Sequence, residues 1–407
     1  MIHTNTRGQK NLPRYFKQVF ELARVAKNGR LDVRLEDGRV FRHDTRRPGP
    51  VAEVVIHDEE VFARMIREGQ LGFCDAYLEG QWSTPDLQAF MDFIHADNDD
   101  LFDGFAGQRL VQLYENFRFW LQRNTKKNAK KNIAAHYDLG NDFYDLWLDD
   151  TMTYSSGIFT TGQESLEAAQ TAKYKSMVDQ MGARPGDHVL EIGCGWGGFA
   201  EYAARERGLK VTCLTISQQQ FNYAVDRIEK AGLSDQVEFK LQDYRDERGT
   251  YDGIASIEMF EAVGEKYWPA YFNAVRDRLK PGKQATLQVI TVPDRRFEVY
   301  RQSVDFIQKY IFPGGMLPSP TVLRKQVEQA GLSVVRSIEF GESYSQTCRR
   351  WHETFNDTWE QARAMGFDDR FRRMWNFYLT SCAATFHFGC CDVTQITIAR
   401  PVLAERA

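Results

Sequence analysis

The chain has 407 residues, of which 43% are hydrophobic and 27% are charged, and this composition is typical of a soluble globular protein. A net charge of −4 gives no global reason to expect a nucleic-acid partner, and no apolar run is long enough to span a bilayer. The seven cysteines are scattered without paired C-x-x-C spacing, so neither a disulfide framework nor a zinc site is indicated. The N-terminus lacks the apolar segment of a signal peptide, so we expect a reducing cytoplasm and no metal site.

The length indicates two domains, and residues 1–122 are expected to form the first, a small α+β domain. Residues 31–41 alternate apolar and polar side chains around Asp37-Gly38, which predicts a β-hairpin. A further strand is expected at 51–57, and periodic apolar positions predict helices at 59–69, 87–95 and 110–121.

A basic stretch, 123–135, follows this domain and contains almost no apolar residue between Arg123 and Asn132. One interpretation is a solvated linker. The other is a contact with anionic phospholipid headgroups, where each Lys or Arg adds about 1 kcal/mol of attraction. The sequence leaves both open.

Residues 136–407 are expected to form the second domain, in which strands and helices alternate. This alternation predicts a parallel sheet covered by helices on both faces, a doubly wound Rossmann-like α/β fold. The expected strands are 188–192, 210–215, 237–241, 253–257, 284–292, 333–340 and 393–400.

The most informative stretch is 189–198, where an apolar strand is followed by glycines at 193, 195, 197 and 198 and then by a helix. Glycine lacks a Cβ, so a strand–glycine–helix turn lets the backbone approach a ligand closely. The spacing G-x-G-x-G-G differs from the dinucleotide fingerprint G-x-G-x-x-G. An acidic residue in the strand, Glu191, and a loop without Lys, Ser or Thr favour a nucleoside with a cationic tail over a triphosphate.

Polar residues also follow the next three strands, at 215–220, 242–245 and 258–261. Each alone is explained by helix capping. Ligands of such sheets bind at the carboxyl ends of the strands, so four polar strand ends beside a glycine loop predict a nucleoside site.

Seven motifs in this order resemble the cyclopropane-fatty-acid synthase and mycolic-acid cyclopropane synthase family. They lie at 136–144 (H-Y-D-L-G-N-D-F-Y), 152–155 (M-T-Y-S), 190–198 (L-E-I-G-C-G-W-G-G), 214–217 (L-T-I-S), 259–261 (M-F-E), 311–319 (I-F-P-G-G-M-L-P-S) and 378–382 (Y-L-T-S-C). The resemblance implies a methyltransferase that uses S-adenosylmethionine to modify double bonds of lipid acyl chains. Residues 1–122 resemble the extra N-terminal domain of the phospholipid-acting members, which implies peripheral association with the inner face of the membrane. The resemblance is also compatible with a homodimer.

The resemblance also assigns residues to the cofactor. Those implied to bind S-adenosylmethionine are Tyr154, Ser155, Glu191, Gly193, Cys194, Gly195, Gly197, Thr215, Ser217, Gln220, Asp243, Tyr244 and Arg245.

The family further holds a bicarbonate ion as base, and the matching catalytic positions are Ser156, Glu261, Gln288, Tyr344 and Cys382. Glu261 would orient or polarise the proton acceptor. Cys382 is equally well explained as a small buried hydrophobe.

The chain departs from the family pattern in this half of the site. Gln288 stands where the family has His, Ala262 replaces the His that follows the Glu, and Ser156 replaces Cys. An amide cannot carry positive charge, so these changes bear on ring closure.

The expected function is therefore transfer of a methylene group to an unsaturated phospholipid acyl chain, giving a cyclopropane ring. Methylation without ring closure, giving a methyl-branched or methylene-bearing chain, is the alternative. A non-catalytic protein that binds the cofactor and lipid is a second alternative. A small-molecule or nucleic-acid methyltransferase is less consistent with the sequence, because neither a basic groove nor an N-P-P-Y motif is present.

Overall fold

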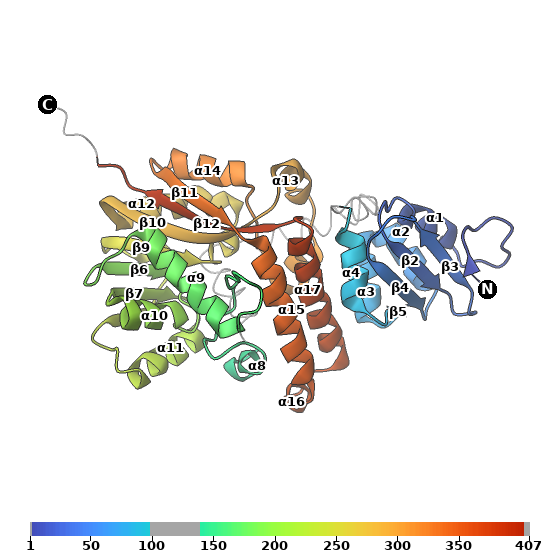
Figure 1. Ribbon diagram of the computed structural model, residues 1–407, viewed down its shortest axis with the longest axis horizontal. Coiled ribbons are helices and arrows are strands. Elements are labelled where there is room, and N and C mark those ends of the chain that lie inside the picture. The colour runs from blue at the N-terminus through green and yellow to red at the C-terminus, as the bar shows by residue number, and fades with distance from the viewer. Residues whose placement is uncertain (1, 98–138, 403–407) are drawn as a thin grey trace. The chain divides into compact units, whose positions relative to one another are not determined.

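The computed structural model describes residues 2–97 and 139–402, and these fall into two compact units (Figure 1). The first unit comprises the described residues within 1–121 together with 302–311 and 356–390, and the second comprises the rest. The predicted helix at 110–121 and the predicted basic linker at 123–135 lie outside the described residues. Within the described ranges, every helix is too short or too polar to cross a membrane.

The first unit contains a five-stranded sheet with the order β1-β3-β2-β4-β5. The predicted hairpin is confirmed, since β2 and β3 pair antiparallel around the turn at Asp37-Gly38. β4 pairs parallel with β2 and antiparallel with β5. The strands are β1 (Ile2–His3), β2 (Arg30–Arg34), β3 (Val40–Asp44), β4 (Val51–Ile56) and β5 (Trp82–Ser83).

The helices of the first unit come from both ends of the chain. The predicted helices at 59–69 and 87–95 are confirmed as α2 and α4. α17 packs against α3 and α4, although they lie far apart in sequence, as the contact between Gln88 and the Thr380 carbonyl, 292 positions apart, illustrates. The helices are α1 (Phe16–Ala23), α2 (Glu60–Glu68), α3 (Gln70–Leu78), α4 (Leu87–His95), the π-helical turn η4 (Ile307–Ile311), α16 (Trp359–Ala364) and α17 (Asp369–His387).

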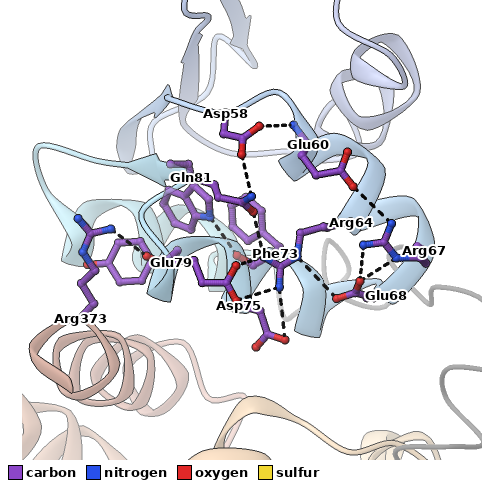
Figure 2. A network of polar contacts seen from close by, with 12 residues as sticks. Asp58, Glu60, Arg64, Arg67, Glu68, Phe73, Asp75, Glu79, Gln81 and Arg373 are labelled. Carbon is purple, nitrogen blue, oxygen red and sulfur yellow. Dashed lines mark hydrogen bonds and ion pairs between the residues drawn. The ribbon is translucent and has the colours of Figure 1, made fainter. Parts of the chain in front are cut away.

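A polar network ties these elements of the first unit together (Figure 2). Arg64 of α2 donates to the carboxylate of Glu79 at 2.5 Å and lies 3.8 Å from Asp75 of α3. Asp75 also accepts from Nζ of Lys309 at 3.0 Å and from the hydroxyl of Tyr310 at 2.6 Å. α3 therefore anchors a segment that lies far along the chain from it.

The second unit contains a seven-stranded sheet with the order β11-β12-β10-β9-β6-β7-β8. All seven predicted strands are present. Six run in the same direction, as expected, and β12 is a correction to the parallel arrangement, because it pairs antiparallel with both β10 and β11. The strands are β6 (His188–Ile192), β7 (Lys210–Thr215), β8 (Val237–Leu241), β9 (Tyr251–Ile257), β10 (Leu279–Thr291), β11 (Ser333–Glu339) and β12 (Asp392–Ala399).

Both faces of this sheet are buried, as the predicted doubly wound fold requires. In β6, Val189 packs with α9 and α10, whereas Leu190 and Ile192 belong to the cluster formed with α12 and α14. The helices of this unit are α8 (Asn141–Asp145), α9 (Leu166–Met181), α10 (Gly198–Arg207), α11 (Gln218–Lys230), α12 (Trp268–Arg278), α13 (Asp294–Tyr300), α14 (Pro320–Gln329) and α15 (Gly341–Asp357), with the 3₁₀ turns η1 (Tyr244–Asp246), η2 (Phe260–Ala262) and η3 (Glu265–Tyr267).

The strand order changes direction at β6, which lies between β7 on one side and β9 on the other. At such a switch point the connections leave in opposite directions, so a crevice opens at the carboxyl ends of the two strands. This edge of the sheet is where the functional residues predicted for the second unit are expected.

Candidate active site

The glycine loop follows β6 and is held tightly against its neighbours. The backbone N–H groups of Gly193 and Cys194 both donate to the carbonyl of Leu214, at 3.0 Å each. Gly193 has φ 84°, and a Cβ at this position would lie 2.6 Å from Cγ of Met259. Only glycine fits here without displacing the segment after β9. The loop therefore joins the ends of β7 and β9, with Gly195 and Gly197 also in left-handed conformations.

Glu191 lies in β6 just before this loop and is 2% exposed. The thiol of Cys213 donates to its Oε2 at 3.5 Å. Burial raises the pKa of Glu191 to about 8, so the side chain carries a proton at neutral pH. A neutral carboxylic acid at this point donates a hydrogen bond as readily as it accepts one.

Hydroxyl and amide groups at the end of β7 form one local arrangement. The hydroxyl of Thr215 accepts from the backbone N–H of Ser217 and donates to Oε1 of Gln220, both at 3.1 Å. Ser217 caps α11 by accepting from the backbone N–H of Gln220 at 3.3 Å. All three side chains are buried, so the segment is preorganised at the carboxyl edge.

The end of β8 carries a closed ion pair. Both carboxylate oxygens of Asp243 accept from the guanidinium of Arg245, at 2.7 and 2.6 Å. The guanidinium lies over the rings of Tyr244 and Tyr267, with its carbon 5.5 and 5.9 Å from their centroids. Asp243 therefore fixes the position of Arg245. The planar groups at the end of β8 are the guanidinium of Arg245 and the two tyrosine rings.

The segment 152–157 reaches the same edge from the N-terminal side of α9. Ser155 is buried, and its hydroxyl accepts from Nζ of Lys173 at 2.7 Å. Lys173 is completely buried in α9 and also donates to Oε1 of Gln170 at 2.6 Å. Burial lowers the pKa of Lys173 to about 7, while the charges of Glu258, Asp149 and Glu191 act to raise it.

Aromatic rings surround Tyr154. Its ring centroid lies 5.4 Å from that of Trp351, 5.5 Å from those of Trp147 and Tyr144, and 6.2 Å from that of Phe312. Such faces carry negative potential and stabilise a cation.

The carboxylate of Glu258 receives hydrogen bonds from three separate segments of the chain. Its Oε1 accepts from the backbone N–H of Ser156 at 2.9 Å and from Nε2 of Gln288 at 2.8 Å. Its Oε2 accepts from the hydroxyl of Tyr344 at 2.6 Å. Burial raises the pKa of Glu258 above the usual carboxyl value, and the three donors and the charge of Lys173 oppose that rise by favouring the charged form.

Glu261 lies one turn further on and has a different environment. Its Oε1 accepts from the backbone N–H of Ile290 at 2.6 Å, and Oε2 meets no hydrogen-bonding atom of the described residues. Burial, reinforced by the charge of Glu258, raises the pKa of Glu261 to about 8. At neutral pH Glu261 is therefore mainly the protonated neighbour of Glu258.

Three of the five predicted catalytic residues thus come together, namely Ser156, Gln288 and Tyr344, and they meet on Glu258. Glu261 lies beside this group rather than at its centre. Cys382 is half-buried on α17 in the first unit, so its predicted role stays a prediction.

Sequence reasoning missed Glu258 and Lys173. Glu258 stands in the same strand-end motif as Glu261, so a second carboxylate three residues earlier was the available signal. Lys173 occupies a position between Ala169 and Met177, one turn from each on the buried face of α9, where an isolated lysine is unusual. Within the described ranges, no cluster of three or more His, Cys, Asp or Glu side chains is arranged to bind a metal ion.

Comparison with known proteins identifies the family of the chain. The family model described as mycolic acid cyclopropane synthetase matches residues 124–396. The chain belongs to this family. Its seven-stranded sheet and flanking helices are those of class I S-adenosylmethionine-dependent methyltransferases.

Two curated relatives cover most of the chain. Tuberculostearic acid methyltransferase UfaA1 of Mycobacterium tuberculosis is 38% identical over 354 residues, which are 85% of this chain and 82% of that protein. Cyclopropane-fatty-acyl-phospholipid synthase of Escherichia coli is 34% identical over 362 residues, which are 86% of this chain and 88% of that protein.

A solved structure is also similar. Mycolic acid cyclopropane synthase CmaA1, complexed with SAH and CTAB, is 30% identical with a TM-score of 0.62 and covers 66% of this chain and 97% of that chain.

Proposed function

We propose that this protein transfers the methyl carbon of S-adenosylmethionine to a double bond in an unsaturated phospholipid acyl chain. The observation that carries the proposal is that the glycine loop after β6 lies beside the partly buried carboxylate of Glu258, at the end of the neighbouring strand β9. The family supports the cofactor and the lipid class, since CmaA1 is described with SAH and CTAB, a long-chain cation.

The residues at the ends of β6, β7 and β8 fit the proposed donor. The glycine loop offers a backbone that a ligand can approach closely, and Gly193 could not carry a side chain without moving Met259. Thr215 and Gln220 would face the ribose, and Tyr244 with Arg245 would face the adenine. Tyr154 and Ser155 would close over the methionine part.

The donor supplies an electrophilic sulfonium methyl group, which a weakly nucleophilic alkene can attack. The positive charge that develops on the acyl chain is stabilised by the aromatic rings around Tyr154. Buried Trp147 and Trp351 also exclude water, which would otherwise capture the cation. The reaction ends when a base removes a proton.

Ring closure is the product that we propose first. A carboxylate beside the glycine loop is suited to remove a proton from the newly attached methyl group, and the released electron pair then closes the cyclopropane. The relative in Escherichia coli is named for this product.

A methyl-branched chain is the second candidate, and a specific observation favours it. The family histidine is replaced by Gln288, a neutral amide, and the 38% identical relative is named a tuberculostearic acid methyltransferase. In this case the base removes a proton from the acyl chain itself, and the methyl group stays intact.

One labelling experiment tests the activity and separates the two products. The full chain is incubated with vesicles of unsaturated phospholipid and with S-adenosylmethionine that carries a trideuterated methyl group. A cyclopropane retains two of the three deuterons and a methyl branch retains all three, so mass spectrometry of the acyl chains distinguishes them. A methylene-bearing chain also retains two deuterons, and double-bond mapping separates it from the ring. Vesicles of saturated phospholipid are the control. Calorimetric binding of the donor without label in any acyl chain would identify a non-catalytic binding protein instead.

We further propose that the protein works at the inner, cytoplasmic surface of an anionic membrane, held there in part by the basic stretch 123–135. Replacing Lys126, Lys127, Lys130 and Lys131 with Gln should weaken attachment to anionic vesicles, because each lysine contributes about 1 kcal/mol near such a surface. The difference should shrink as salt screens the charges. Neutral vesicles are the control, and equal attachment of both proteins at low salt would make this stretch a linker only.

A further inference from the structure

The carboxylate of Glu258 accepts hydrogen bonds from all three donors around the proposed position of the base. Ser156, Gln288 and Tyr344 come from the segment before α9, from β10 and from α15, and each donates to the carboxylate of Glu258 at 2.9 Å or less. Three donors from three elements are more than a surface glutamate needs. This arrangement is typical of a site built to hold a carboxylate in its charged form.

The Gln288 donor is fixed by a second layer of buried amides. Its Oε1 accepts from Nε2 of Gln395 at 3.0 Å, which directs its own Nε2 toward Glu258. Gln395 in turn accepts, through Oε1, from the hydroxyl of Ser176 and from Nε2 of Gln180, both at 2.6 Å. Gln288 and Gln395 are both completely buried, so the direction of this donor is set by the core.

The backbone of Glu258 adopts a strained conformation that the surrounding structure must hold in place. Glu258 has φ 47°, in the left-handed region that costs a non-glycine residue about 1–2 kcal/mol. Its N–H donates to the carbonyl of Gln288 at 2.9 Å, so the same residue orients both backbone and side chain. Strain of this kind concentrates at functional positions.

A bound bicarbonate does not fit this environment. The backbone N–H of Ser156, the amide of Gln288 and the hydroxyl of Tyr344 are the donors that would hold it, and Glu258 already uses them. A second anion would also face the negative charge of Glu258 at close range. The nearby cation, Lys173, directs its Nζ to Ser155 and Gln170 instead.

We propose that Glu258 is the resident proton acceptor of this enzyme and takes the place of the bicarbonate base that the family resemblance implies. The inference rests on the proposed function, because it assigns the base of that reaction. Glu258 is only partly buried, whereas Ser156 and Gln288 are 0% exposed, so the carboxylate is the accessible member of the group.

The proton step balances without a further reagent. A carboxylate oxygen of Glu258 forms an O–H bond with a proton of the carbocation, and the C–H electron pair becomes either the last ring bond or a new double bond. Glu258 is then a neutral acid, and the proton passes to water before the next turnover. No oxidant, reductant or external anion takes part.

The test compares the wild-type chain with Glu258→Gly, with and without added bicarbonate. Glycine is suited to this position because it adopts φ 47° without strain, so the variant is expected to fold. The same substitution leaves the three donors free to hold a small anion. Methyl transfer is measured in carbon-dioxide-free buffer and after addition of bicarbonate, and binding of ¹³C-labelled bicarbonate is followed by NMR. Glu238→Gln, at a side chain that is 64% exposed, is the control.

We expect wild-type turnover to change less than about twofold on adding bicarbonate, because the base is already present. Turnover of Glu258→Gly should fall about 10²–10⁴-fold, the usual contribution of a general base, and bicarbonate should restore part of it. Labelled bicarbonate should bind to the variant and not to the wild type.

The assignment would be overturned if labelled bicarbonate bound to the wild type and turnover of Glu258→Gly did not fall. It would also be overturned by a wild-type enzyme that is inactive until bicarbonate is added. The NMR experiment measures bicarbonate binding independently of turnover. If the wild type binds no bicarbonate and also transfers no methyl group, the proposed function is contradicted, whereas the occupancy of the site by Glu258 is not.

Discussion

The two halves of the carboxyl edge in the second unit are built in different ways. At the ends of β7 and β8 the polar groups bond to residues of the same short segment, as Thr215 does with Gln220 and Asp243 with Arg245. At the ends of β9 and β10 the partners of Glu258 lie far away in the chain, at 156, 288 and 344. The proposed cofactor half thus includes local contacts, whereas the proposed base half depends on contacts between distant parts of the chain.

The largest effect on the local half is expected from Gly193→Ala. An alanine here would have to adopt a left-handed backbone conformation, and its Cβ would lie 2.6 Å from Cγ of Met259. Together these two costs should lower the free energy of unfolding by about 2–5 kcal/mol. Donor affinity, measured by calorimetry, should fall as well. Gly195→Ala is the matched control, because Gly195 is also left-handed but has nothing within 4 Å of its Cβ. Equal losses in urea unfolding at both positions would contradict the proposed tight loop.

This contrast also explains what the sequence could predict. Strand positions and the glycine loop follow from residues close together in the chain, so periodicity and turn chemistry located them. The convergence on Glu258 could not be derived that way, because its donors are separated by up to 188 positions and only the folded sheet, with α9 and α15 beside it, brings them together. The antiparallel β12 was missed for the same reason, since strand direction depends on the path of the chain and not on strand composition.

The next effect concerns the pH dependence of stability at Glu261. Its pKa is raised from 4.5 to about 8 in the folded state, so its stabilising contribution is complete below pH 4.5 and is lost as the pH rises toward 8. Glu261→Gln cannot ionise and should therefore be more stable than the wild type at pH 9, by on the order of 5 kcal/mol, and similar to it at pH 4.5.

Urea unfolding at both pH values checks this expectation. Glu238→Gln, at an exposed side chain on β8, is the control substitution. A Glu261→Gln protein that is less stable than the wild type at pH 9 would contradict the assignment. Turnover of this variant at pH 7 should change only a few-fold, because the amide replaces a carboxyl that is already mostly neutral.

A smaller effect is expected from Tyr344→Phe. A hydrogen bond to a charged group is worth about 1.5–3 kcal/mol, so its loss should raise the pKa of Glu258 further and move the acid limb of the turnover profile up by about one to two pH units. Turnover at pH 7 should fall by about tenfold. Tyr202→Phe, on α10, is the control. An unshifted acid limb would show that Tyr344 does not act on the base.

The smallest change in rate is expected from Gln288→His. An imidazole can accept from Gln395 and donate to Glu258, so turnover should change less than about threefold. The family residue at this position carries charge when protonated, and we expect the share of cyclopropane over methyl-branched product to rise. Trideuterated donor and mass spectrometry measure the ratio, and an unchanged ratio would remove Gln288 from the control of product identity.

The division of the carboxyl edge into a donor half and a base half is tested most directly by Glu258→Gln. Calorimetry should give an affinity for S-adenosylmethionine within about twofold of the wild type, while methyl transfer to unsaturated phospholipid falls at least about a hundredfold. Retained turnover, or a loss of donor affinity in proportion to the loss of turnover, would contradict the account.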